Sequence, residues 1–323
     1  MAGARDIRAG AAAALLALAG LGAGAAPAAE GPPSLRVASV APPSVPGARL
    51  RPLGALAIRG DRPEFGGFSA LEVSADGARL VAVSDRGLWL EAGILRENGG
   101  LSGLEGARSP ALLGPAGAIP PPVRRDAEGL AIAAGDLSGA RAASFERLHR
   151  VARFDGPEGP ERRGPALPRE VTEADGNGGL EALAVAPDGR LLALSEAEGP
   201  GGAGSLALWL HPDGATTLTR LAHDPRFRPV GADFGPDGRL YVLGRRYSLR
   251  EGFRFAIWRH APEGHAPGVP EMLLEAPAGD ASDNAEGLAV WRDGDGRLRV
   301  VVITDDNFSL MQRTLLIEYV LEE

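Results

Sequence analysis

Short apolar runs alternate with glycine-rich turns after the first 30 residues of the chain, and one phrase recurs among them. Each copy combines a serine or acidic residue, a small residue and an apolar run, and a second apolar run with a polar end follows most copies. The copies are Gly-Phe-Ser-Ala-Leu-Glu-Val at 67–73, Asp-Ala-Glu-Gly-Leu-Ala-Ile at 126–132, Gly-Leu-Glu-Ala-Leu-Ala-Val at 179–185, a degenerate Val-Gly-Ala-Asp-Phe at 230–234, and Asn-Ala-Glu-Gly-Leu-Ala-Val at 284–290. Such a repeat decides the architecture of a chain.

The third copy shows most clearly which structure the pattern predicts. Its apolar run at 183–185 is followed by Pro-Asp-Gly at 187–189 and by a second run at 191–194. An Asp-Gly pair between two such runs indicates a β-hairpin, because glycine adopts the positive φ of a tight turn. Two further runs at 206–210 and 216–221 complete the unit. Four short strands in each unit are typical of a β-propeller blade.

The spacing of the copies supports an all-β fold. Their central residues lie 49 to 59 residues apart, and propeller repeats span roughly 40–50 residues. These central residues are Leu71, Leu130, Leu183, Ala232 and Leu288. Frequent glycine and proline argue against helical repeats. We predict a single β-propeller of five or six four-stranded blades, closed by pairing N-terminal strands near 34–40 and 50–58 with the C-terminal run 314–321.

The chain begins with a pattern that is typical of a secretory signal peptide. Arg5 and Arg8 precede an apolar stretch at 11–26, which ends in small residues. We predict a signal peptide at 1–28 and a mature protein that is periplasmic or secreted. A membrane anchor is the alternative. We favour export because the stretch is rich in alanine and glycine and no second apolar segment follows it.

Composition narrows the range of partners. The chain contains no cysteine and therefore no disulfide, and a net charge of −8 argues against a nucleic-acid partner. We predict an N-terminal segment at 29–49 and one propeller domain at 50–323, with no membrane span in the mature chain. The expected state is a monomer.

The polar ends of the predicted strands define a candidate site. A hairpin returns to the end at which it started, so the start of each first strand and the end of each second strand lie on one face. In a propeller the first strands line the central channel, so these ends converge at one mouth of the axis. The expected neighbours are Glu181 with Glu196, Glu286 with Asp305 and Asp306, Ser69 with Asp85, and Asp126 and Glu128 with Glu146.

Converging carboxylates raise each other's pKa values unless cations compensate them. The candidate metal ligands are Asp85, Asp126, Glu128, Glu181, Glu196, Glu286 and Asp305. A site rich in oxygen and poor in histidine favours Ca²⁺ or Mg²⁺ over zinc. The candidate substrate-binding cations are Arg86, Arg125, Arg147, Arg245 and Arg246. In a structural alternative, the glutamates cap backbone N–H groups of the next blade and Arg–Glu pairs join the blades. No nucleophile is recognisable, so no catalytic residue is assigned.

Several phrases occur together in a specific order. They are Phe65-Gly-Gly-Phe-Ser-Ala-Leu, Ser84-Asp-Arg-Gly, Arg125-Asp-Ala-Glu-Gly-Leu, Ser144-Phe-Glu-Arg, Asn177-Gly-Gly-Leu-Glu-Ala-Leu, Gly244-Arg-Arg-Tyr and Asp283-Asn-Ala-Glu-Gly-Leu, with Asp305-Asp-Asn-Phe. From about residue 50 to the C-terminus, this set resembles the bacterial "esterase-like activity of phytase" family. The family is similar to propeller phytases, which hydrolyse phosphate monoesters with Ca²⁺ ions held by carboxylates at the channel mouth. The fourth blade departs from the pattern, because it has Val230 in place of the strand-opening glutamate and Gly244 where an acidic residue is expected.

The leading hypothesis is an exported, calcium-dependent phosphoesterase or esterase-like hydrolase that acts on a small-molecule phosphate or ester. The carboxylates would hold the cations, and the arginines would bind substrate oxygens through forked hydrogen bonds. A sugar-lactonase-like metal hydrolase and a non-catalytic propeller that binds a ligand or a protein are the alternatives.

Overall fold

The computed structural model describes residues 33–172, 179–198, 204–263, 266–279 and 282–323. The predicted signal peptide lies outside these residues. The compact unit that contains the described residues extends from Pro32 to Glu323. No helix in the described part of the chain is long and apolar enough to cross a membrane.

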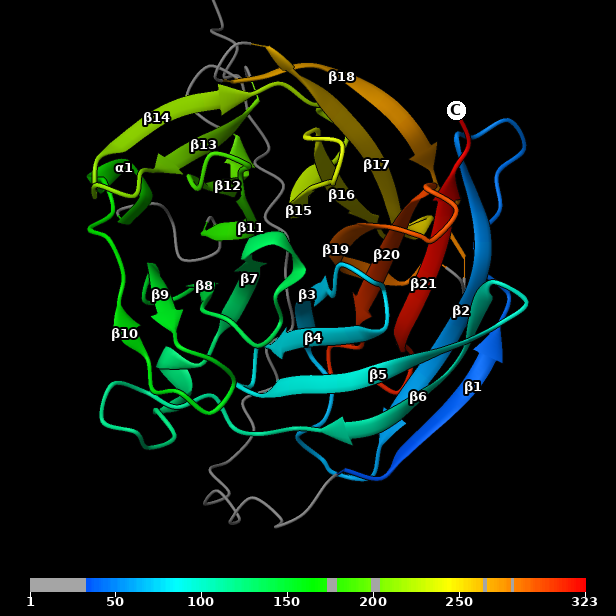
Figure 1. Cartoon of the computed structure of the whole chain (residues 1–323), viewed down its shortest axis with the longest axis horizontal. Coiled ribbons are helices and arrows are strands. Elements are labelled where there is room, and N and C mark those ends of the chain that lie inside the picture. Colours follow the sequence, from blue (N-terminus) through cyan, green and yellow to red (C-terminus); the bar gives the residue numbers. More distant parts are fainter. Residues whose placement is uncertain (1–32, 173–178, 199–203, 264–265, 280–281) are drawn as a thin grey trace, which may run out of the picture. The chain divides into compact units, whose positions relative to one another are not determined.

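Four sheets of this unit contain four antiparallel strands each and follow one another along the chain (Figure 1). The first blade consists of β3 (Phe68–Val73), β4 (Arg79–Ser84), β5 (Trp89–Glu97) and β6 (Gly100–Arg108). The second consists of β7 (Ala127–Ile132), β8 (Arg141–Phe145), β9 (Arg150–Phe154) and β10 (Arg162–Arg163). The third consists of β11 (Leu180–Val185), β12 (Leu191–Glu198), β13 (Ser205–Leu210) and β14 (Thr216–Leu221). The fourth consists of β15 (Arg228–Phe234), β16 (Leu240–Ser248), β17 (Gly252–Glu263) and β18 (Ala266–Glu275).

The fifth blade joins the two ends of the unit. Its inner strands are β19 (Asn284–Arg292), β20 (Leu298–Asp305) and β21 (Thr314–Leu321), and β2 (Leu50–Gly60) pairs with β21. The strand β1 (Leu35–Val40) then pairs with β2 and makes this sheet five-stranded. The predicted closure is therefore confirmed, and part of the segment expected ahead of the propeller belongs to its last blade.

The described residues form a five-bladed ring, which resolves the choice between five and six blades. The innermost strands β3, β7, β11, β15 and β19 contact one another in a closed cycle. Five separate clusters of buried apolar side chains fill the five interfaces between neighbouring blades. Each interface therefore has its own core, and no blade buries its apolar faces alone. The only described helices are α1 (Arg169–Thr172) and the 3₁₀ turns Pro122–Arg124 and Ala133–Gly135.

The Asp-Gly turns have the chemistry that the sequence predicts. Between β11 and β12, Gly189 has a φ of +82°, which side chains disfavour. The side chain of Asp188 accepts a hydrogen bond from the backbone N–H of Arg190, at 3.1 Å between Oδ1 and N. The turn therefore closes by local hydrogen bonding, and it lies at the end of the blade opposite Glu181.

The structure explains each position of the recurring phrase. The antiparallel register is interrupted by a β-bulge at the second or third residue of every innermost strand. A bulge adds a residue without a partner and redirects its side chain. The bulged residues are Ser69, Glu128, Glu181, Val230 and Glu286, which we name the bulge ring.

The next position of the phrase is glycine or alanine because neighbouring inner strands approach closely there. A Cβ on Gly231 would lie 2.8 Å from the carbonyl oxygen of Glu286. A Cβ on Gly287 would lie 2.8 Å from the Cα of Ala70. Larger side chains would push the blades apart, so the small residue at this position permits closure of the ring.

Candidate functional site

A second ring of polar residues lies in, or directly after, the second strand of each blade. In each blade, the residue before the bulge pairs with a residue of the second strand, as Leu180 pairs with Ser195. The ring member is the next residue along the chain, which is Glu196 in this blade. We name these five residues the strand-end ring. They are Asp85, Glu146, Glu196, Arg245 and Asp305. The strand-end ring and the bulge ring lie at the same end of the blades, as the hairpin argument predicted.

The axis below the rings is nearly filled. The cavity between the inner strands has a volume of about 10 Å³, and the repeated leucines with their small neighbours line it together with Glu181 and Val230. Because a water molecule barely fits into such a volume, the propeller has no open axial channel at this level. We name the space above this level the bowl, and the residues that line the small cavity form its floor.

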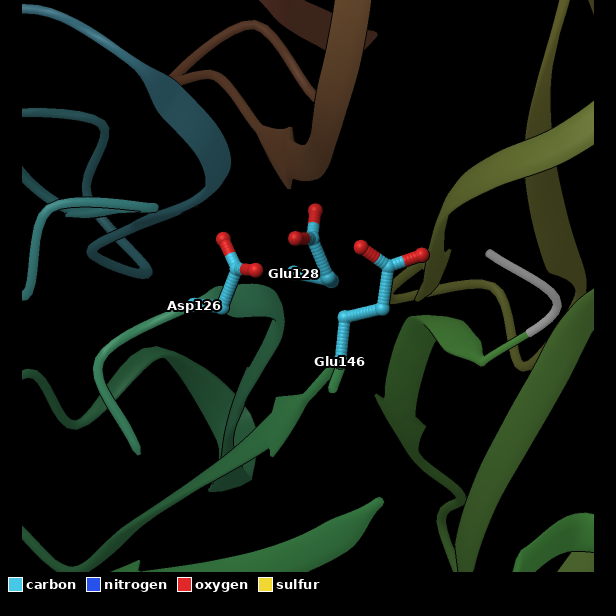
Figure 2. Close-up of side chains that lie close together, drawn as sticks. All are labelled: Asp126, Glu128 and Glu146. Carbon is cyan, nitrogen blue, oxygen red and sulfur yellow. The ribbon is translucent and has the colours of Figure 1, made fainter. Parts of the chain in front are cut away.

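Three carboxylates of the second blade lie close together in this bowl. One oxygen each from Asp126, Glu128 and Glu146 lies within 4.8 Å of the others. Figure 2 shows the three carboxyl groups at the end of the second blade, facing one shared space. The Nε of Arg147 donates a hydrogen bond to Asp126, while most of the arginine side chain stays in solvent. The trio thus combines negative charge with a single arginine at its edge.

Arg245 occupies the opposite part of the mouth and connects three blades. Its Nη1 donates to Oδ1 of Asn284 at 2.6 Å and to Oε1 of Glu286. Its Nη2 lies 3.2 Å from Oε1 of Glu196. The amide of Asn284 in turn donates to Glu286 at 2.9 Å. Arg245 therefore compensates carboxylates of the third and fifth blades from its place in the fourth.

Asp85 lies in a third part of the mouth, beside the loop that follows β20. Its Oδ1 is buried and accepts no hydrogen bond, and Nε of Arg86 is 3.9 Å from it. The guanidinium of Arg86 stacks over the ring of Phe308, 4.2 Å from its centre. Gly67 has a φ of +63°, and a Cβ there would lie 2.1 Å from Oδ1 of Asp85. The backbone of Gly67 therefore leaves room for this carboxylate.

Burial and mutual repulsion raise the pKa values of the mouth carboxyls. Burial, followed by the charge of Asp305, raises the pKa of Asp85 to about 8. Burial also raises the pKa of Glu286 to about 8, although Arg245 opposes the shift. Burial and the nearby Asp126 raise the pKa of Glu146 to about 7. Such shifts mean that burial, together with the neighbouring carboxylates, disfavours the ionised form of these groups.

Glu128 and Glu181 of the bulge ring and Asp305 of the strand-end ring also have raised pKa values. Burial raises the pKa of Glu128 well above its ordinary value, and the charge of Glu181 adds to the effect. The pKa of Glu181 is likewise raised by burial and then by Glu196 and Glu146. Burial raises the pKa of Asp305 to about 6, and a hydrogen bond from the backbone N–H of Asn307 opposes the shift. Glu181 thus interacts with the carboxylates on both sides of the bowl.

The five arginines selected from the sequence lie in different surroundings. Arg86, Arg147 and Arg245 contact mouth carboxylates, as described above. Arg246 extends away from Arg245 and its Nη2 donates to Glu251 at 2.7 Å. The Nε of Arg125 donates to the carbonyl of Pro120 at 2.6 Å. Substrate binding by these arginines stays a prediction.

Sequence reasoning did not select Asn284, and it expected Asp306 beside Glu286 without predicting its contacts with the first blade. Asn284 opens β19 and contacts Arg245 and Glu286, and the phrase Asp-Asn-Ala-Glu places it two residues before the bulge. Asp306 accepts hydrogen bonds from the backbone N–H groups of Gly67 and Phe308, both at 3.1 Å. Neither spacing nor composition shows that a loop from the fifth blade reaches the first.

Comparison with known proteins agrees with this description. The phytase-like family, described as having the esterase-like activity of phytase, matches residues 63–308. The chain belongs to this family. No curated protein matches the chain. The match of the phytase-like family covers all of the first four blades and both rings at the mouth.

Solved structures are similar to this phytase-like chain in fold. The catalytic domain of a GH62 α-L-arabinofuranosidase from Coprinopsis cinerea has a TM-score of 0.51 at 13% identity, over 88% of this chain and 97% of that one. A protein of unknown function from Dyadobacter fermentans has a TM-score of 0.45 at 11% identity, over 90% of this chain and 91% of that one. The TM-score of the arabinofuranosidase domain indicates a shared fold, and its identity of 13% carries no activity over.

Proposed function

We propose that this protein is an exported, calcium-dependent phosphoester hydrolase whose active site is the mouth of the propeller. The observation that carries the proposal is the trio Asp126, Glu128 and Glu146, whose oxygens lie within 4.8 Å of one another. Membership in the phytase-like family supports hydrolysis as the reaction class. Export rests on the signal-peptide pattern of residues 1–28.

The donor set fits a calcium ion. Every candidate ligand is an oxygen, and Ca²⁺ takes six to eight oxygen ligands, carboxylates above all. Oδ1 of Asp85 is buried without a hydrogen-bond partner, and burial raises the pKa of this group to about 8. A buried polar atom without a partner is costly, so a cation near it would offset that cost. The trio Asp126, Glu128 and Glu146 would thus hold the ion, and Asp85 in a neighbouring part of the mouth would be stabilised by its charge.

A bound Ca²⁺ would polarise a phosphoryl oxygen and make water near it more acidic. Arg147 and Arg86 lie at the edge of the bowl with 65% and 59% of their side chains exposed. They would bind the remaining phosphoryl oxygens, because a guanidinium matches phosphate geometry with two parallel donors. The floor of the bowl excludes bulk water from below.

Hydrolysis of 4-nitrophenyl phosphate and of bis(4-nitrophenyl) phosphate tests the proposal. We expect turnover with Ca²⁺ and none with a chelator. Glu128→Gln should lower kcat/KM at least tenfold, which corresponds to about 1.4 kcal/mol of transition-state stabilisation. The matched control is Glu158→Gln, because Glu158 is an exposed carboxylate that pairs with Arg108 outside the mouth; this variant should retain full activity.

The other outcomes of this assay are informative. Hydrolysis of 4-nitrophenyl acetate without any phosphate release would replace phosphoester hydrolysis by ester hydrolysis at the same site. Calcium-dependent opening of a sugar lactone would favour the lactonase-like alternative. Calcium binding without hydrolysis of any of these substrates would contradict the catalytic proposal and leave a ligand-binding propeller.

A further inference from the structure

The strand-end ring contains one member of opposite charge. Four blades place a carboxylate at this position, namely Asp85, Glu146, Glu196 and Asp305, whereas the fourth blade places Arg245 there. The fourth blade also has Val230 in the bulge ring, where three other blades have glutamate. The strand-end ring is therefore interrupted in one blade only, and it is interrupted by a cation.

The contacts of Arg245 resemble those of a bound cation. Its guanidinium contacts oxygens of Glu196, Asn284 and Glu286, which come from the two neighbouring blades. Two carboxylates and one carboxamide oxygen are the ligand types that Ca²⁺ prefers. The side chain is only 21% exposed. One half of the mouth thus already holds a positive charge among hard oxygen ligands.

The other half lacks an equivalent charge. Asp126, Glu128 and Glu146 have Arg147 as the basic partner of Asp126, and this arginine is largely in solvent. Ion pairs with exposed arginines contribute little. The second-blade half therefore has an exposed arginine, and no buried one, among its described side-chain contacts.

We propose that Arg245 is the built-in cation of the mouth, so that the site binds one Ca²⁺ ion, in the half formed by Asp126, Glu128 and Glu146. This inference rests on the calcium-dependent function proposed above. A second ion near Glu196 and Glu286 would have to displace the guanidinium and leave it buried without its partners. An unpaired buried charge costs several kcal/mol, so the second ion is excluded at ordinary calcium concentrations.

The inference assigns the protein to a mechanistic class. In two-metal hydrolases the ions lie roughly 3.5–4 Å apart and bind both the attacking and the leaving oxygen. Here one of the two positive charges is a side chain whose position is determined by three blades. The chemistry would accordingly be that of a single-metal site, and Arg245 is a positioning residue that determines the number of metal ions.

Titration calorimetry with calcium alone on the purified protein tests the inference. We expect one ion per wild-type chain. Arg245→Gln removes the charge and keeps an oxygen at the end of the side chain, so it should bind two ions. The matched control is Arg147→Gln, because Arg147 also contacts a mouth carboxylate but lies in solvent; it should still bind one ion.

A second variant covers the case in which Arg245→Gln does not fold. Glu196→Gln removes a carboxylate from the arginine half and should leave the wild-type stoichiometry of one ion, with an affinity changed less than threefold. Glu128→Gln should abolish binding. Three results would overturn the inference without affecting the proposed function. They are one ion in Arg245→Gln, two ions in the wild type, or loss of an ion in Glu196→Gln. A wild type that binds no calcium would instead overturn the proposed function and the inference with it.

Discussion

The two ends of the inner strands both bury carboxylates, but they compensate them differently. At the end opposite the mouth, Oε1 of Glu72 accepts a hydrogen bond from the backbone N–H of Ile132 in the next blade, at 3.1 Å. Oδ2 of Asp233 accepts one from the N–H of Val290 in its next blade, at 2.6 Å. At the mouth, the neighbours of Glu181 are other carboxylates and Arg245. At the first end each of these carboxylates accepts a hydrogen bond from a backbone N–H of the next blade, whereas at the mouth side chains of neighbouring blades face one another.

This difference separates the carboxylates that bond to the next blade from those of the proposed site. Glu72 and Asp233 occupy the same position of the recurring phrase, one residue after its centre, and the remaining blades have alanine there. Carboxylates that cap the next blade therefore occur at the end away from the mouth, at two residues that the sequence analysis did not select. A carboxylate that bonds to backbone N–H groups needs no added cation, whereas a group of crowded carboxylates does.

Calcium should give the largest effect and should act on the mouth alone. A ligand that binds only the folded state stabilises it by about 2.7 kcal/mol at a concentration of 100 times Kd. We expect thermal unfolding at pH 7.5 to shift upward with calcium relative to chelator. Glu128→Gln should lose this shift and Glu72→Gln should retain it. Equal shifts in both variants would contradict the comparison between the two ends.

Removal of a capping carboxylate should give the next largest effect. Asp233→Ala leaves the N–H of Val290 buried without an acceptor, which costs about 1–3 kcal/mol. Asp233→Asn keeps an acceptor and should recover most of that loss. Glu181→Gln in chelator should be neutral or stabilising, because it removes a charge from a crowded group. Denaturant unfolding measures all three, and a large loss in Glu181→Gln would contradict the assignment of the mouth.

The pH dependence of stability should distinguish the ends as well. The pKa of Asp85 is raised from 3.8 to about 8, and that of Glu286 from 4.5 to about 8. The pKa of Asp233 is raised from 3.8 to about 7. Between these limits the folded state binds more protons than the unfolded state, so stability falls as pH rises. In chelator, the melting temperature should be highest near pH 5 and should decrease towards pH 8.

Calcium should remove most of this decrease. Metal binding displaces protons from the mouth carboxyls, so the stabilisation by calcium should increase with pH between 6 and 8. Asp233 keeps its own contribution in either condition, and Asp233→Asn should remove it. A melting temperature that rises from pH 5 to pH 8 in chelator would show that the mouth carboxyls do not have the raised pKa values described here.

The smallest effect on stability is expected at the edge of the mouth. Arg86 is 59% exposed and its Nε lies 3.9 Å from Asp85, so the pair contributes less than about 1 kcal/mol. Stacking on Phe308 adds about 0.5–1 kcal/mol. Arg86→Gln should therefore change the unfolding free energy little while raising KM for a phosphate substrate. A large loss of stability with unchanged KM would assign Arg86 a structural role.

Much of this fold could be predicted from the sequence because its determinants are local. Apolar runs of strand length, separated by Asp-Gly turns at a near-constant interval, specify antiparallel blades. The C-terminal strand was expected at 314–321 and is observed at Thr314–Leu321. The convergence of Glu181 with Glu196 also follows from hairpin geometry alone. The repeat therefore determined the propeller and the face that carries the mouth.

Tertiary structure alone decided how each charged side chain is used. The bulge at Glu181 depends on the register between two strands, and no residue type marks it. Adjacent residues Arg245 and Arg246 look equivalent in the sequence, yet alternation along β16 directs one to the mouth and the other to Glu251. Burial, which raises the pKa values, is a property of all five blades together. Electrostatic partners come from different blades, so only the closed ring determines them.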